Sequence, residues 1–347
     1  MRRSLIAVAC FLTFGPGVWL LPANAQDATP AATPGVASSP AAGCVAGTEE
    51  QNVALARRWF AVWGSPDAAG FEAIAQPDIV HHWGVGEDTT SVADLRARTQ
   101  VFTSAFPDPR ITLDQVIADG DYVVVRWTHT ATQTGQFFDL EPSGIQATWT
   151  GINIFRFECG RIAESWNEFD AVGLRAQLTG MTDPIAGDLA TPSVPATPVA
   201  DCAPTSERDA VDVALQWAGV WGSGDVDLFD ELAAPASVHH WGLGQDTMSL
   251  QDFKDRIGAF FAAVPDMHST TEAPIVEGNL VAIRWTNTGT QTGPLFGFEP
   301  TGASLTWTGI NIFRVECGQI VESWSEADGL GLRAQLEAAS GAATPAA

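Results

Sequence analysis

Carboxylates and a tryptophan alternate along one segment that occurs twice in the chain. The first copy carries Glu164, Trp166, Glu168 and Asp170, and the second carries Glu322, Trp324, Glu326 and Asp328. Side chains two positions apart in a β-strand lie on the same face, so each set would share one surface. Carboxyl groups beside an indole suit general acid/base chemistry, because an apolar neighbour raises a carboxyl pKa toward neutrality.

Each carboxylate also has a structural interpretation. Asp170 is either a general base or the N-cap of the helix that AVGLRAQL predicts. Glu164 belongs either to a reactive site or to an ion pair with Arg126 or Arg156, and Glu168 could face water. The pattern alone leaves both sets of interpretations open.

Adjacent histidines provide the second candidate feature. His81 and His82 precede Trp83, and the same HHWG motif returns with His240 as the counterpart of His82. Neighbouring residues in a strand point to opposite faces, so at most one histidine of each pair would enter a common cavity. No HxH or HxxxH spacing is present, so we predict no metal site and expect neutral, hydrogen-bonded imidazoles.

These groups recur because the chain contains a duplicated domain. The segment TWTGINIFR occupies residues 148–156 and again 306–314, and residues 44–178 align without a gap on 202–336 with about half the positions identical. We predict two domains, at 44–180 and 202–338. Segments rich in Ala, Thr and Pro surround them, and these predict a disordered arm at 26–43, a linker at 181–201 and a disordered tail at 339–347.

Helical periodicity comes first in each copy and strand patterns follow. Apolar spacing predicts helices over 49–63 and 91–106, and β-rich runs predict strands over 111–117, 122–134, 146–158 and 161–169. This order predicts an α+β fold of two tandem cone-shaped domains, each with helices packed on a curved antiparallel sheet. Several strands are apolar on both faces, which requires a partner or a pocket on the face that the helices leave open.

The first 25 residues read as an export signal. Two arginines precede an apolar run that Gly15, Pro16 and Gly17 interrupt, and a small-residue cleavage site ends at Ala25. A retained membrane anchor is the alternative, but it needs about 18 unbroken apolar residues. We therefore predict a secreted or extracytoplasmic protein. The formal net charge of −24 disfavours nucleic acid and anionic membrane as partners.

Export changes how the cysteines are interpreted. Apart from Cys10 in the signal segment, four cysteines obey the repeat offset, and repetition favours one bond in each copy, Cys44 to Cys159 and Cys202 to Cys317. Free thiols or a four-cysteine metal site are the alternatives, although no CxxC pair exists. Each bond would tie an N-terminal arm to a hairpin tip.

A family resemblance extends over nearly the whole of each copy. Its motifs include Pro77-Asp78 before His82, Phe106-Pro107-Asp108, Thr132-Gln133-Thr134-Gly135, Glu141-Pro142-Ser143-Gly144 and Gly160-Arg161-Ile162 before Glu164, Trp166 and Asp170. In this order they resemble the SnoaL-like polyketide cyclase family. The resemblance implies a nuclear-transport-factor-2-like cone that is open at one end over an apolar pocket.

The resemblance also implies a function. Cyclases of this family close a ring by intramolecular aldol condensation without a cofactor, and the general acid/base role would fall to Asp170 and Asp328. The predicted substrate-binding residues are His82, His240, Trp166, Trp324, Asn153 and Asn311. We thus expect a cyclase or isomerase acting on a small apolar carbonyl compound, or alternatively a non-catalytic module for hydrophobic-ligand binding or dimerisation. The two domains are expected to dock sheet to sheet as an intrachain pseudo-dimer.

Overall fold

The computed structural model of the chain describes residues 44–65, 68–180, 202–242 and 246–341. The predicted signal peptide at 1–25, the arm at 26–43 and the linker at 181–201 lie outside the described residues.

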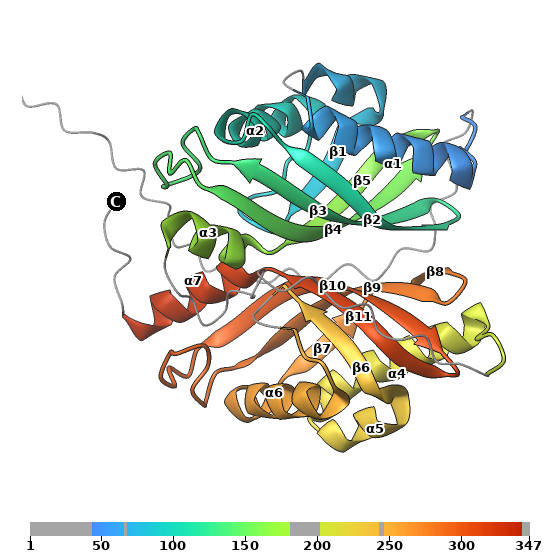
Figure 1. The fold of residues 1–347 in the computed structure, drawn as a ribbon, viewed down its shortest axis with the longest axis vertical. Helices are drawn as coiled ribbons and strands as arrows, with labels where there is room; N and C mark the ends of the chain where they lie inside the picture. The colour runs from blue at the N-terminus through green and yellow to red at the C-terminus, as the bar shows by residue number, and fades with distance from the viewer. Residues whose placement is uncertain (1–43, 66–67, 181–201, 243–245, 342–347) are drawn as a thin grey trace, which may run out of the picture. The chain divides into compact units, whose positions relative to one another are not determined.

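The two copies contain the same succession of elements (Figure 1). The first copy, which we call repeat 1, comprises α1 (Glu49–Trp63), η1 (Ala68–Ala73), β1 (Ala75–Trp83), α2 (Val92–Ala105), β2 (Arg110–Asp119), β3 (Tyr122–Thr132), β4 (Gln146–Glu158), β5 (Arg161–Phe169) and α3 (Ala171–Thr179). Repeat 2 comprises α4 (Glu207–Ser223), η2 (Val226–Leu228), α5 (Phe229–Leu232), β6 (Ala233–Trp241), α6 (Leu250–Ala263), β7 (His268–Thr271), β8 (Ile275–Glu277), β9 (Leu280–Thr290), β10 (Ser304–Glu316), β11 (Gln319–Ala327) and α7 (Gly329–Ser340).

Each repeat has one sheet, and the predicted α+β fold is confirmed. The strand order is β1-β5-β4-β3-β2 in repeat 1 and β6-β11-β10-β9-β7 in repeat 2, where β8 also pairs with β9. The sheets are mixed rather than wholly antiparallel, because β1 runs parallel to β5 and β6 runs parallel to β11. The helical segment between β1 and β2 returns the chain to the far edge of the sheet, which allows this parallel pairing.

One proline explains the main difference between the two sheets. Strand β2 is continuous in repeat 1, whereas its counterpart in repeat 2 is divided into β7 and β8 on either side of Glu272, Ala273 and Pro274. Proline has no backbone N–H to donate to the ladder, so it interrupts a strand or marks its edge. Repeat 1 has Val116 at the equivalent position and keeps the strand intact.

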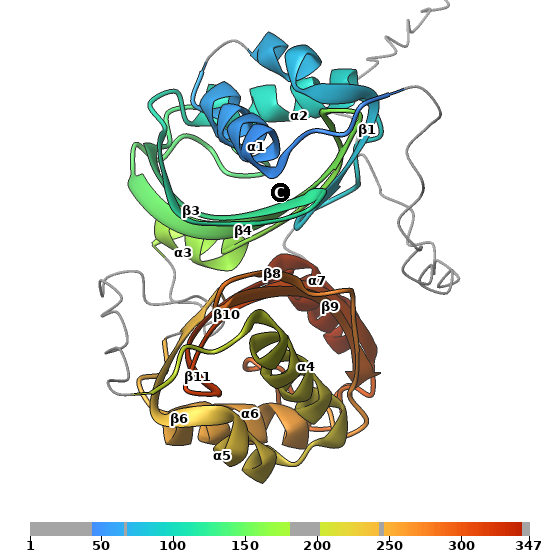
Figure 2. The same ribbon diagram turned by 90° about the vertical axis from the view of Figure 1, so that its right-hand side faces the viewer.

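The first helix of each repeat lies within the curve of its own sheet, as Figure 2 shows for α1 and α4. Helix α1 begins with a capping box, in which Thr48 accepts a hydrogen bond from the backbone of Gln51 while the Gln51 side chain accepts one from the backbone of Thr48. Helix α2 ends at Ala105, just before Phe106 and Pro107, as the preference of pre-proline residues for extended backbone requires.

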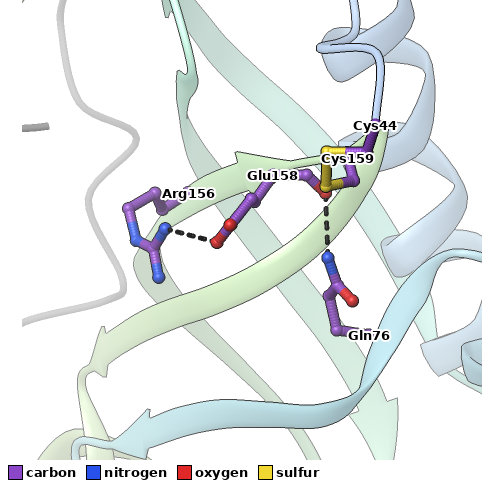
Figure 3. The surroundings of a disulfide bond; sticks show 5 residues. All are labelled: Cys44, Gln76, Arg156, Glu158 and Cys159. Carbon is purple, nitrogen blue, oxygen red and sulfur yellow. Dashed lines mark hydrogen bonds and ion pairs between the residues drawn. A yellow bond between two sulfur atoms is a disulfide. The ribbon is translucent and has the colours of Figure 1, made fainter. Parts of the chain in front are cut away.

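Both predicted disulfides are present. Cys44 is bonded to Cys159 and Cys202 to Cys317, with Cα–Cα distances of 5.2 and 5.5 Å. Cys159 and Gly160 form a two-residue hairpin turn between β4 and β5, and both have positive φ, which matches the right-handed twist of the strands. Figure 3 shows this bond beside β4, where Gln76 donates to the carbonyl oxygen of Glu158.

Three apolar clusters hold the described residues together. One lies between the helices and sheet of repeat 1, and a second lies in the same place in repeat 2. The third combines residues of both repeats: Ile117, Val124, Ile152 and Ile154 with Ile275, Ala282, Ile310, Ile312 and Trp324. The outer faces of the two sheets therefore share one core. Arg126 lies 5.7 Å from the centroid of the Trp324 ring, and Arg284 makes the reciprocal contact with Trp166.

None of the helices in the described ranges is long and apolar enough to cross a membrane.

Candidate ligand-binding site

The final strand of each repeat along the chain, β5 or β11, has two chemically different faces. In β5, Asn167 and Phe169 point toward the helices and line a small cavity. Glu164, Trp166 and Glu168 occupy the alternate positions and lie on the outer face, where Trp166 packs against the core shared by both repeats. The predicted acidic surface thus exists, but it faces away from the cavity.

Two carboxyl groups on this outer face are buried between the repeats. The Thr308 hydroxyl donates to Glu168 over 2.6 Å, and the Thr150 hydroxyl donates to Glu326 over 2.5 Å. Burial raises the pKa of both Glu168 and Glu326 to about 8. At neutral pH these are therefore mainly neutral acids that join the repeats, and the alternative that Glu168 faces water does not hold.

Asp170 and Asp328 cap helices. The Asp170 carboxylate accepts the backbone N–H of Gly173 at the start of α3 over 2.7 Å, and Asp328 does the same for Gly331 at the start of α7. Burial raises the pKa of Asp170 to about 7 and raises that of Asp328 in the same direction. Neither aspartate is among the described residues that line the cavity of its own repeat. The geometry matches the helix-cap interpretation, and a catalytic role stays a prediction.

His82 and His240 belong to charge networks on the outer face. His82 contacts Asp88 through Nδ1 at 2.6 Å and Glu164 through Nε2 at 3.1 Å, and its ring stacks on Trp166. Burial opposes a charge on this imidazole, but the hydrogen bonds to the two carboxylates outweigh it and raise the pKa of His82 to about 9. Glu164 also accepts from Arg156 over 3.0 Å, one of the two arginines that the sequence offered.

The same network recurs in repeat 2. His240 contacts Asp246 at 2.6 Å and Glu322 at 3.0 Å and stacks on Trp324. These hydrogen bonds raise the pKa of His240, as the matching ones do for His82. With a pKa of about 9, His82 is charged at neutral pH, which differs from the expected neutral imidazole. Both histidines lie on the face opposite the cavities together with Trp166 and Trp324. The neutral histidines are their neighbours, since burial lowers the pKa of His81 and of His239 to about 3.

The two repeats differ in the space that their helices and sheets enclose. Repeat 2 contains a cavity of about 590 Å³, whereas the corresponding cavity of repeat 1 has about 40 Å³. Small-molecule sites typically measure about 300–1,000 Å³, and the smaller space is closer to the volume of a single water. The larger cavity is lined by the tryptophans Trp217, Trp221, Trp241, Trp285 and Trp307.

A few substitutions between the repeats explain this difference. Phe60 and Phe169 of repeat 1 are buried and line its small cavity, and alanines replace them in repeat 2 as Ala218 and Ala327. Further equivalent pairs at the cavity walls also have a smaller side chain in repeat 2: Ile111 is replaced by Ser269, His129 by Asn287 and Asn167 by Ser325. Repeat 1 therefore fills with its own side chains the space that repeat 2 leaves open.

Polar groups in the larger cavity are few. The side-chain oxygen of Asn311 accepts from Trp285 Nε1 at 2.5 Å and from Ser325 Oγ at 3.2 Å, which leaves the amide NH₂ of Asn311 as its group for a ligand. Asn287 is buried, and its side-chain oxygen has no hydrogen-bond partner among the described residues. Of the predicted binding residues, Asn153 and Asn311 are the two that line the cavities.

The titratable side chains that line the larger cavity determine which reactions it could catalyse. Within the described ranges no carboxylate and no histidine lines it, and Arg256 is its one charged lining residue. No cluster of three or more metal-ligating side chains occurs anywhere in the same ranges. Among the described residues, the cavity walls thus supply hydrogen-bond donors and a cation but no carboxylate or imidazole that could act as a general base.

Helices inside a curved mixed sheet, around a central apolar cavity, define a cone-shaped class of α+β proteins. The model of the SnoaL-like polyketide cyclase family matches residues 53–178 and again 211–336, which together are more than half of the chain. The chain therefore belongs to the SnoaL-like polyketide cyclase family and contains two copies of its domain. No match was found among curated proteins.

Several solved structures are similar to a part of the chain that is about one repeat long. AclR from Streptomyces galilaeus is 29% identical, with 39% of this chain and 85% of that chain covered and a TM-score of 0.36. IdmH from Streptomyces antibioticus is also 29% identical, with 37% and 97% covered and a TM-score of 0.33. TsrD from Streptomyces laurentii is 25% identical, with 39% and 98% covered and a TM-score of 0.35.

Proposed function

We propose that repeat 2 binds one small, largely apolar molecule in its tryptophan-lined cavity, and that repeat 1 does not bind this ligand. The observation that carries the proposal is the difference between about 590 and 40 Å³ in two domains of the same fold. A cavity of the larger size with aromatic walls provides the apolar contact that a ligand of one to three rings needs. Asn311, whose amide NH₂ is left for a ligand, suits a carbonyl oxygen.

Repeat 1 acts in this proposal as the permanent partner of repeat 2. Its outer face covers the apolar outer face of repeat 2 through the shared isoleucine cluster, and the Glu168–Thr308 and Glu326–Thr150 hydrogen bonds fix the pairing. An intrachain pseudo-dimer of this kind would keep the binding domain folded without a second chain. The ligand site would then be complete within one molecule.

The test is a titration of the full chain with N-phenyl-1-naphthylamine, a neutral probe whose fluorescence rises in apolar surroundings. The probe should bind saturably with one molecule per chain, and it should quench tryptophan emission because five tryptophans line the cavity. Two equivalent probe molecules per chain, or no saturable binding, would refute the proposal.

Cyclisation is the second candidate, and family membership is the observation that favours it. Asp328, which caps α7 and is not among the residues that line the larger cavity, would be the general acid/base in this candidate, and burial raises the pKa of its carboxyl group. A test is conversion of 2,6-heptanedione, in which an intramolecular aldol reaction forms a C–C bond and loses water to give an enone. Turnover by the wild type that Asp328→Asn abolishes would support this candidate, and equal rates with and without protein would refute it.

We further propose that the protein works outside the cytoplasm. The two disulfides are the supporting observation, because such bonds persist in oxidising compartments. Fractionation of the native host would test this, and recovery of the protein in the cytoplasm with reduced cysteines would contradict it.

A further inference from the structure

Two pairs of polar residues lie on the cavity side of the repeat 2 sheet. Asn311 on β10 lies directly opposite Ser325 on β11, and Asn287 on β9 lies directly opposite Ser269 on β7. All four residues line the larger cavity. Opposite residues on neighbouring antiparallel strands have Cβ atoms about 4.5–5.5 Å apart, so each pair forms one polar patch. We call them the Asn311 patch and the Asn287 patch.

The Asn287 patch holds a hydrogen-bonding group that the protein leaves unsatisfied. Asn287 is 3% exposed, and its side-chain oxygen has no hydrogen-bond partner among the described residues. Burying a polar group without a partner destabilises the protein, and a ligand that supplies the partner removes this cost. A half-turn of the amide exchanges its donor and its acceptor, so a group that both donates and accepts suits it in either orientation. A hydroxyl is such a group.

The Asn311 patch requires a different group. Its amide is fixed, because the side-chain oxygen of Asn311 already accepts from Trp285 Nε1 and from Ser325 Oγ. The NH₂ of Asn311 is therefore the donor that the patch presents, and its partner has to be an acceptor such as a carbonyl oxygen. The two patches thus differ in the chemical group that each can bind.

An aromatic surface separates the two patches. In the ladder between β9 and β10, Asn287 pairs with Trp307, and Asn311 follows four residues further along β10. Four residues span about 13 Å in an extended strand, and the curvature of the sheet (Figure 2) shortens the straight line between the patches. Midway between them Trp285 pairs with Gly309, and any side chain at Gly309 would overlap the indole. The ring of Trp285 therefore lies flat on the sheet between the two polar patches.

Repeat 1 does not offer the same arrangement. Ile111 and His129 stand at the positions of Ser269 and Asn287, so one member of the pair is apolar. Nε2 of His129 also has no partner among the described residues, but the adjoining cavity of about 40 Å³ has room for about one water. In repeat 2 the unsatisfied amide instead borders about 590 Å³.

We infer that the ligand of repeat 2 is an elongated molecule with a polar group at each end, a carbonyl oxygen that binds Asn311 and a hydroxyl that binds Asn287. Its apolar or aromatic body lies against Trp285 and Trp307. This inference rests on the proposed binding function and adds the chemical class of the ligand. A hydrogen bond between neutral groups changes affinity by roughly two- to tenfold, so the hydroxyl should have a measurable effect.

Three neutral probes test the inference on the full chain by isothermal titration calorimetry. The first, 4-acetylbiphenyl, has the carbonyl end alone. The second, 4-acetyl-4′-hydroxybiphenyl, adds a hydroxyl at the far end, and the third, 4-acetyl-2′-hydroxybiphenyl, has the hydroxyl beside the bond between the rings. We expect the 4′-hydroxy probe to bind roughly fivefold more tightly than 4-acetylbiphenyl, and the 2′-hydroxy isomer to gain nothing.

Substitutions assign the preference to one residue. The readout is the ratio of the dissociation constants of 4-acetylbiphenyl and the 4′-hydroxy probe. Asn287→Leu replaces the amide by an apolar side chain of similar size and should bring this ratio to about one. His129→Leu, the matched change in repeat 1, should leave the ratio at its wild-type value. Circular dichroism shows whether each variant is folded, and Asn287→Ala decides the case if Asn287→Leu is unfolded.

A parallel titration with N-phenyl-1-naphthylamine separates this inference from the proposed function. If that probe does not bind saturably, the proposed function fails and the inference fails with it. If it binds with one molecule per chain but the wild-type ratio is about one, the binding function stands and the two-ended class is refuted. An equal gain for the 2′-hydroxy isomer would also refute it. A ratio that keeps its wild-type value in a folded Asn287 variant, or that His129→Leu also lowers to one, would overturn the assignment to Asn287.

Discussion

Filling the cavity of repeat 2 with the residues found in repeat 1 should abolish ligand binding and increase the stability of the fold. The double substitution Ala218→Phe and Ala327→Phe places in repeat 2 the two side chains that occupy the small cavity of repeat 1, where Phe60 and Phe169 are 8% and 5% exposed. Each new ring would move into a space that now totals about 590 Å³, so neither needs to displace the backbone.

The magnitude follows from the apolar area that these rings bury. Burying a phenylalanine side chain contributes about 1.5–3 kcal/mol, and imperfect packing of an inserted ring typically costs about 1–3 kcal/mol. Two well-buried rings contribute up to about 6 kcal/mol and their packing costs at least about 2 kcal/mol, so we expect the free energy of unfolding to rise by up to about 4 kcal/mol for the pair, measured by urea denaturation. Saturable binding of N-phenyl-1-naphthylamine should disappear in the same variant.

A conservative change in repeat 1 provides the control. Phe60→Leu lies at the position equivalent to Ala218 and should leave both the affinity for the probe and the ratio of one per chain as in the wild type. If the double variant is well folded and still binds the probe with wild-type affinity, the assignment of the site to the repeat 2 cavity is refuted.

Three further predictions concern the framework. The pKa of Glu168 and of Glu326 is higher in the folded state than the ordinary value of 4.5, so the folded protein holds these protons more tightly, and its stability should fall as pH rises from about 4.5 through about 8. Thermal unfolding at pH 5, 7 and 9 would show this fall, and a Glu168→Gln, Glu326→Gln variant that kept the full dependence of stability on pH would contradict it. Asp328→Asn preserves an N-cap and should change the free energy of unfolding by less than about 0.5 kcal/mol, whereas Asp328→Ala should cost about 1–2 kcal/mol in urea titrations; equal losses in the two would contradict the cap. Serine in place of Cys202 and Cys317 opens a bond between residues 115 positions apart and should cost about 2–5 kcal/mol, measured against the oxidised wild type; no change in the denaturation midpoint would refute a stabilising role.

Much of the framework could be predicted from local sequence. Periodicity and turn residues placed α1 at 49–63, β4 at 146–158 and β5 at 161–169, and the structure has the same bounds. The pairing of Cys44 with Cys159 followed from the repeat alone. These features depend on interactions between near neighbours or on the duplication, and both are visible in the chain.

The orientation of the functional face could not be obtained in this way. Strand alternation groups Glu164, Trp166 and Glu168 on one face, but it does not say which face meets the helices when both are rich in apolar residues. Glu168 is buried because a second sheet covers it, and this contact is non-local. The carboxylates therefore suggested a reactive interior, whereas Glu168 and Glu326 lie at the junction between the repeats.

The larger cavity left a weaker trace in the sequence. The sequence-based prediction relied on residues that are identical in the two repeats, such as Asn153 and Asn311. The cavity of repeat 2, by contrast, arises from positions at which the repeats differ. The exchanges of Phe60 for Ala218 and of Phe169 for Ala327 are visible in the aligned repeats. Their meaning required the knowledge that all four positions lie at the cavity walls.

A crystal structure of the full chain grown with N-phenyl-1-naphthylamine would show directly whether repeat 2 is the binding domain. We expect density for one probe in repeat 2, enclosed by Trp217, Trp285 and Trp307, and none in the interior of repeat 1. A probe inside repeat 1, or on the surface alone with the repeat 2 cavity closed by side chains, would contradict it.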